Sequence, residues 1–243
     1  MWNSEGTEIF SCSVDGFICQ IDIKTSKLVS KFHTNCSDKA IQVSSASRKG
    51  TGRGREPLYS ICLHPTERSV IVGSLSRLTW MDLDTKSPLK TLEGGHVGVV
   101  TSLTVLQMYK QCYILSAGES SDDYTITAWK LTLEGEIDPQ DKGKLKKQSH
   151  HTSSDSIVAK FSANESVRSV CVSPIIGDKT SNNSAISEES EQIFGAITKS
   201  GTLHCFKHDF SATKKKKPIK PKSSIQVRNI SKLCLGPKTS IIP

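Results

Sequence analysis

The sequence predicts an all-β fold made of short antiparallel strands, and three observations lead to that prediction. Apolar and polar residues alternate with a period of two in runs such as 125–130 and 202–207, as they do in half-buried strands. Glycine, aspartate, serine or proline bounds each run, which is typical of tight turns. A similar unit recurs at intervals of 60, 48 and 77 residues, which exceed a bare repeat of about 40 to 45 residues because polar loops are inserted, and no long helical period interrupts it.

The clearest unit lies between residues 95 and 130 and resembles a WD repeat. It contains a Gly-His pair, a serine in the second strand, an aspartate in the following turn and a tryptophan in the third strand. In a WD repeat these side chains form one buried hydrogen-bond chain, because polar groups that are buried need partners. We therefore expect His96, Ser116, Asp123 and Trp129 to form a structural network that fixes the sheet.

Three fainter copies accompany this unit, so the predicted fold is a WD-repeat β-propeller with about four recognisable blades in a partial or open ring. Met81-Asp82, Lys130 after Trp129, and Phe206-Lys207 occupy the Trp-Asp position of their copies. The first copy is expected to lack its first strand. The expected segments are a partial blade at 1–35, a Ser/Gly/Arg-rich loop at 36–56, a blade at 57–97, a blade at 98–162 with a charged insertion at 132–155, a blade at 163–210 with a polar insertion at 175–191, and a basic tail at 211–243.

Positive charge is concentrated at the C-terminal end of the chain. Residues 211–243 carry nine lysines and arginines and no acid, and the net charge of the whole chain is +8, so residues 1–210 sum to −1. A compact tract holds six of the nine: Lys214, Lys215, Lys216, Lys217, Lys220 and Lys222. Two prolines disfavour a helix there. Such a tract suits a nuclear import receptor or a phosphate backbone, and the alternative is a solvated linker.

A second basic segment is spaced by glycines in the first predicted loop and comprises Arg48, Lys49, Arg53 and Arg55. Arginines interleaved with glycines are found in loops that contact RNA. The segment is short, so a simple polar insertion between blades is the alternative interpretation.

Several classes of function find no signal in the sequence. No run of 18 apolar residues predicts a membrane helix, and the N-terminus lacks a signal-peptide pattern. The eight cysteines are scattered without a C-x-x-C pair, which favours buried thiols in a reducing compartment over disulfides or a metal site. No nucleophile motif or phosphate-binding loop occurs. We therefore expect no catalysis, no metal and no cofactor.

The order of the units adds a resemblance to one family. The segments 58–73, 89–96, 100–106, 114–130 and 193–207, together with the Lys-Pro-rich sequel, are similar to the nucleolar WD repeat-containing protein 43 family. The resemblance covers most of residues 10–243, but the chain shows about four blades where a closed ring commonly has seven, and it ends before the family's C-terminal helical region. We therefore expect it to be a partial chain.

The resemblance implies a non-catalytic scaffold subunit of the small-subunit processome, in the nucleus and nucleolus. There it would link ribosomal DNA transcription with early pre-rRNA processing and 18S rRNA maturation. The implied partners are other WD-repeat processome subunits and pre-rRNA or snoRNP particles, direct or indirect, with no membrane and no small-molecule substrate. Two alternatives stay open: a generic WD-repeat adaptor, for example a ubiquitin ligase substrate receptor, which would not require the basic tail, and a propeller enzyme.

Overall fold

The computed structural model describes residues 1–34, 55–108, 111–119, 125–132, 156–173, 191–210 and 218–226. These residues form fifteen β-strands in four antiparallel sheets, and no helix occurs among them. The prediction of an all-β fold is confirmed.

Each sheet is a meander in which consecutive strands of the chain are neighbours. The first sheet contains β1 (Glu8–Cys12), β2 (Phe17–Asp22) and β3 (Lys27–His33). The second contains β4 (Ser60–Leu63), β5 (Ser69–Gly73), β6 (Leu78–Asp82) and β7 (Pro88–Leu92). The third contains β8 (Val99–Met108), β9 (Gln111–Glu119), β10 (Thr125–Leu131) and β11 (Ile157–Ser162). The fourth contains β12 (Val167–Val172), β13 (Glu191–Thr198), β14 (Thr202–Asp209) and β15 (Ser223–Gln226).

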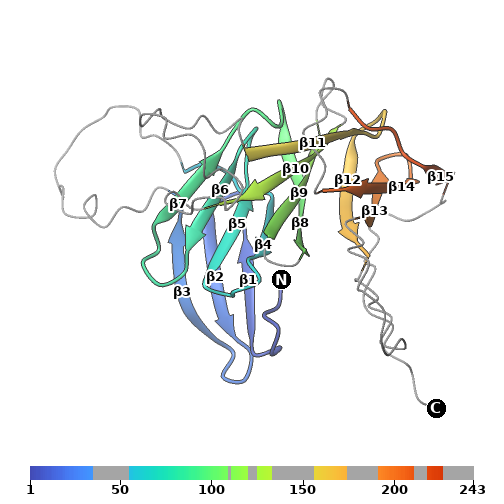
Figure 1. The fold of residues 1–243 in the computed structure, drawn as a ribbon. Helices are drawn as coiled ribbons and strands as arrows, with labels where there is room; N and C mark the ends of the chain where they lie inside the picture. The colour runs from blue at the N-terminus through green and yellow to red at the C-terminus, as the bar shows by residue number, and fades with distance from the viewer. Residues whose placement is uncertain are drawn as a thin grey trace, which may run out of the picture.

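The first strands of the four sheets contact one another in succession (Figure 1). Strand β1 contacts β4, β4 contacts β8, and β8 contacts β12. Side-chain hydrogen bonds support these contacts: the Ser60 hydroxyl donates to the Val100 carbonyl at 2.7 Å, and the Val170 amide donates to the Ser102 hydroxyl at 3.1 Å. The arrangement is compatible with a β-propeller, in which sheets pack face to face around their innermost strands.

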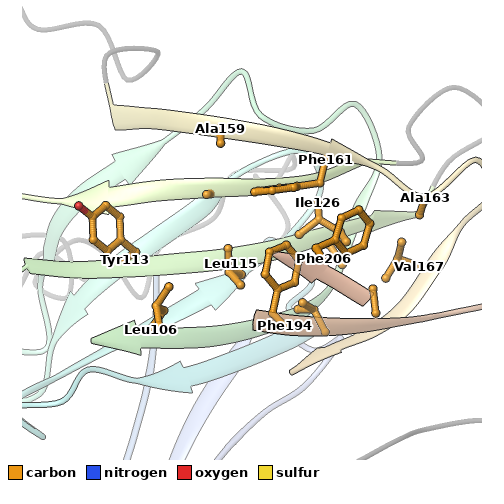
Figure 2. Packing of buried hydrophobic residues seen from close by; sticks show 14 of the residues in the cluster. Leu106, Tyr113, Leu115, Ile126, Ala159, Phe161, Ala163, Val167, Phe194 and Phe206 are labelled. Atoms are coloured by element: carbon orange, nitrogen blue, oxygen red, sulfur yellow. The ribbon is translucent and has the colours of Figure 1, made fainter. Parts of the chain in front are cut away.

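Hydrophobic side chains fill the space between consecutive sheets. Phe10, Ile18, Phe32 and Met81 belong to the cluster between the first and second sheets. The cluster between the second and third includes Trp80 and Trp129. The cluster between the third and fourth is rich in rings (Figure 2): Phe161 lies edge-on to Phe194 with centroids 4.8 Å apart, and Phe194 stacks on Phe206 at 5.0 Å. The second and third sheets therefore bury both faces, one against each neighbour, whereas the first and fourth sheets each bury one face in this way.

Two turns with the same side-chain chemistry connect the last two strands of the first and second sheets. The Asp22 carboxylate accepts hydrogen bonds from the amide and the hydroxyl of Thr25, at 2.6 and 2.8 Å. Asp82 accepts the corresponding pair from Thr85, at 2.6 and 2.9 Å. The residue after each threonine has a positive φ. This shared turn is a direct structural sign that the sheets are repeats.

The boundary of the fourth sheet differs from the expected one, because β15 lies within 211–243, the segment assigned to a basic tail. Its residues pair with β14, Leu203 opposite Ile225 and Cys205 opposite Ser223. Residues 218–226 contain two isoleucines, Ile219 and Ile225, six positions apart, so no alternation predicted the strand. The first sheet has three strands, as expected, and Trp2 adds an isolated antiparallel bridge to Ile9. Most of the two predicted insertions and residues 36–54 lie outside the described residues.

Candidate functional site

A buried hydrogen-bond network joins three of the four residues expected from the WD pattern. The Ser116 hydroxyl, on β9, accepts a hydrogen bond from the indole Nε1 of Trp129 on β10 at 2.7 Å. It also lies 2.6 Å from Nε2 of His96, which precedes β8. The same hydroxyl donates to the Thr127 carbonyl at 3.3 Å. Asp123 lies outside the described residues.

The loop that carries His96 is fitted closely against Trp129. A Cβ on Gly95 would come within 2.1 Å of Cζ2 of the Trp129 ring, so only glycine leaves room for the indole. The Gly95 carbonyl accepts hydrogen bonds from the Thr127 hydroxyl at 3.1 Å and from Nζ of Lys160 at 3.4 Å. The network therefore ties the loop before the third sheet to strands β9, β10 and β11.

The chemistry of this network is structural. Ser116 and Trp129 are both 0% exposed, so no substrate reaches the hydroxyl. A serine nucleophile of the Ser-His-Asp type must be open to its substrate. The serine oxygen instead satisfies the N–H group of a buried indole, which would otherwise lose hydrogen bonding on leaving water.

Sequence reasoning missed a second buried tryptophan–serine pair, in the second sheet. The Trp80 indole donates to the Ser69 hydroxyl at 2.7 Å, and the ring stacks on His64 with centroids 5.4 Å apart. Trp80 faces the third sheet, whereas Trp129 faces the second. The sequence shows a tryptophan beside Met81 on a short strand, but the hydrogen bond from Trp80 to Ser69 depends on the register between β5 and β6.

In the second and fourth sheets, the positions aligned with Trp129 are buried as well. Met81 and Phe206 are 0% and 1% exposed, and each packs toward the preceding sheet, as Trp129 does. Neither residue can donate a hydrogen bond to a serine. In these copies the position contributes packing alone.

The basic tract is divided by the structure. Lys214 to Lys217 lie outside the described residues, whereas Lys220 and Lys222 are described and exposed. Both lysines belong to an anchored segment, residues 218–226, which we call the strap. The Ile219 amide donates to the Lys160 carbonyl at 2.8 Å, the Ser162 amide donates to the Ile219 carbonyl at 2.9 Å, and the Lys222 amide donates to the Cys205 carbonyl at 2.8 Å.

The strap joins the third sheet to the fourth. Ile219 makes a parallel bridge to Phe161 and packs against the aromatic cluster between these sheets. Further along, the Ser224 hydroxyl lies 2.7 Å from Nδ1 of His204, a histidine that is 6% exposed and whose Nε2 has no hydrogen-bond partner among the described residues. Backbone pairing and side-chain packing therefore hold Lys220 and Lys222 at fixed positions on the outer edge of these two sheets.

Of the four basic residues in the predicted arginine-rich loop, Arg55 belongs to the described residues. Arg48, Lys49 and Arg53 lie outside the described residues. Arg55 is exposed, and its guanidinium carbon lies 4.3 Å from the centroid of the Phe17 ring. The structure therefore places this arginine beside an aromatic side chain of the first sheet.

The described cysteines are free thiols, and burial makes three of them unreactive. Desolvation raises the pKa of Cys12 to about 11 and that of Cys112 to about 12, and it raises the pKa of the fully buried Cys62 further still. Such thiols stay protonated at neutral pH and are poor nucleophiles and metal ligands. Within the described ranges no three His, Cys, Asp or Glu side chains converge as metal ligands would.

No family model matches the chain, and no curated protein matches it. In the part of the chain that the structure describes, no helix is long and apolar enough to cross a membrane.

Proposed function

We propose that this chain is a WD-repeat β-propeller protein that works as a non-catalytic scaffold. The observation that supports it best is the His96–Ser116–Trp129 network inside a four-stranded meander, whose first strand packs between the first strands of its two neighbours. Rigid sheets of this kind present their loops on wide rims, where several partners bind at once.

The setting we propose is ribosome biogenesis, in the nucleolus. The scaffold would act in the small-subunit processome and link ribosomal DNA transcription with early pre-rRNA processing. Support comes from the sequence resemblance described above and from the exposed lysines at 220 and 222, which extend the basic tract onto the outer edge of the sheets. Cationic side chains in fixed positions favour a polyanionic partner such as pre-rRNA.

A generic WD-repeat adaptor in another complex is the second candidate, and the strap is the observation that favours it. Because Ile219 and β15 complete the third and fourth sheets, part of the basic tract has a structural role that any adaptor would keep. The tract alone therefore does not require an RNA partner.

Affinity purification of the tagged full chain from growing cells separates the two candidates. The proposed function predicts co-purification of pre-rRNA and other processome subunits, and nucleolar localisation by imaging. Recovery of a ubiquitin ligase or another cytosolic complex, without pre-rRNA, would reject it in favour of the adaptor.

A further inference from the structure

Two cations and two rings meet on one side of the first sheet, in a group that we call the cation–aromatic cluster: Phe17, Lys31, His33 and Arg55. Nζ of Lys31 lies 4.0 Å from the centroid of the Phe17 ring, and the Arg55 guanidinium carbon lies 4.3 Å from it. The His33 ring is edge-on to Phe17, with centroids 6.2 Å apart. The cluster thus combines positive charge with aromatic surface.

The register of the sheet places the cluster on the face that the second sheet does not cover. Phe17 pairs with His33 and Cys19 pairs with Lys31, so Phe17, Lys31 and His33 share one face of β2 and β3. The intervening residues Ile18 and Phe32 point the opposite way, into the cluster with the second sheet. Lys31 and Arg55 are exposed and Phe17 is half-buried, so solvent reaches the charged groups.

The backbone holds Arg55 beside Phe17. Gly16, in the turn before β2, has a φ of 81°, and a Cβ there would lie 2.6 Å from Cβ of Arg55. The turn therefore packs directly on the backbone of the arginine. A hydrogen bond of 3.2 Å from the Leu58 amide to the Ser13 carbonyl fixes the same approach. Such fixed positions lower the entropy lost when a ligand binds.

Within the part of the chain that the structure describes, neither Lys31 nor Arg55 forms an ion pair with an acidic side chain. The carboxylate of Glu56, next to Arg55, is occupied by Arg77, whose Nε donates to both of its oxygens at 2.9 Å. The charge of Asp15 interacts with both cations without forming an ion pair, and its carboxylate accepts a hydrogen bond from the Phe17 amide at 3.2 Å.

We propose that the cation–aromatic cluster binds single-stranded RNA, with a base stacked against Arg55 and Phe17 and a phosphate on Lys31. Unpaired bases stack on guanidinium planes and aromatic side chains, while lysines contact the backbone. A phosphorylated peptide would use the two cations but not the aromatic surface, so the ring favours RNA. The inference rests on the proposed function, and it adds a binding site at the opposite end of the chain from the basic tract.

Fluorescence anisotropy with a labelled 12-nucleotide oligouridine tests this on the purified full chain. Arg55→Lys keeps the charge and removes the planar group, so Kd should rise about tenfold with little change in the salt dependence. Lys31→Gln should weaken binding at low salt and reduce the slope of log K against log salt by about 0.7, the value for one lost phosphate contact on a single strand. Lys27→Gln is the matched control, an exposed lysine near the other end of β3, and should change Kd less than about twofold.

Failure of this site is distinguishable from failure of the proposed function. If Arg55→Lys and Lys31→Gln both bind as Lys27→Gln does, the cluster is not an RNA site, whatever the chain co-purifies with. Displacement of the oligonucleotide by a phosphoserine peptide at equal or lower concentration would also overturn the proposal, because it would assign the site to a peptide. Conversely, wild-type chain that binds RNA through this cluster but never enters nucleolar particles would reject only the ribosomal setting.

Discussion

Replacement of Ser116 by alanine should destabilise the third sheet strongly, because one hydroxyl connects two buried rings. In Ser116→Ala the Trp129 indole N–H loses its acceptor at 2.7 Å, inside a site that water does not reach. A buried donor left without a partner costs about 1 to 3 kcal/mol, and the lost contact with His96 Nε2 at 2.6 Å adds about 1 kcal/mol. The free energy of unfolding should therefore fall by about 2 to 4 kcal/mol, a large part of the roughly 5 to 15 kcal/mol typical of a domain.

Urea denaturation of the full chain, followed by tryptophan fluorescence, measures this change. Ser11→Ala is the matched control, since Ser11 is an exposed serine in the middle of β1, and its effect should stay within about 0.5 kcal/mol. A double-mutant cycle with Trp129→Phe isolates the hydrogen bond, because the phenylalanine ring cannot donate it. The reasoning is refuted if Ser116→Ala unfolds at the same urea concentration as Ser11→Ala, or if the two substitutions in the cycle are additive.

Three more predictions address the strap, a turn and the basic tract. Ile219→Ser should lower the free energy of unfolding by about 1 to 3 kcal/mol and speed hydrogen exchange of the Lys222 amide, because Ile219 packs on the aromatic cluster. Ile225→Ser is the control, since Ile225 is 59% exposed, and equal effects of the two substitutions would contradict the anchoring role of Ile219. The hydrogen bond from the Thr85 amide lowers the pKa of Asp82 below its usual 3.8, so the carboxylate stabilises the fold above that pH and the contribution is lost as pH falls through the lower folded value. Acid titration of unfolding should therefore show a smaller loss of stability in Asp82→Asn than in wild type, and equal losses would contradict this contribution. Glutamine substitution of the whole basic tract should reduce nucleolar accumulation and the salt dependence of pre-rRNA recovery, while the melting temperature stays nearly unchanged; the residues are Lys214, Lys215, Lys216, Lys217, Lys220 and Lys222. The charge control combines Lys24→Gln with Lys27→Gln. If localisation and RNA recovery do not change, the tract is a solvated linker.

Local patterning was sufficient to predict most of the fold. Alternation with a period of two predicted the strands, and it also placed Met81, Trp129 and Phe206 at one shared position, where all three are buried. The spacing of His96, Ser116 and Trp129 was enough to group them, because a repeat motif encodes both the strands and their register.

The features that the sequence did not predict depend on register or on contacts between distant segments. Strand β15 has too few apolar residues for any period to appear, and it forms because β14 offers an unpaired edge while Ile219 anchors the chain nearby. The pair of Trp80 and Ser69 needs the alignment of two strands. Arg55 and Phe17 lie on either side of a long connection, and the packing of the Gly16 turn together with the hydrogen bond between Leu58 and Ser13 brings them together.

The strap also changes how deletions of this protein should be interpreted. A truncation after residue 210, designed to remove a targeting signal, would also remove the outer strand of the fourth sheet and the isoleucine that seals the neighbouring aromatic cluster. Phe210 and His204 would then be exposed at a new edge, and a newly unpaired strand edge recruits other chains. Mislocalisation of such a truncated protein could therefore result from aggregation or degradation as well as from loss of a targeting signal. Charge-neutralising substitutions that keep Ile219 and residues 223–226 intact separate sorting from folding.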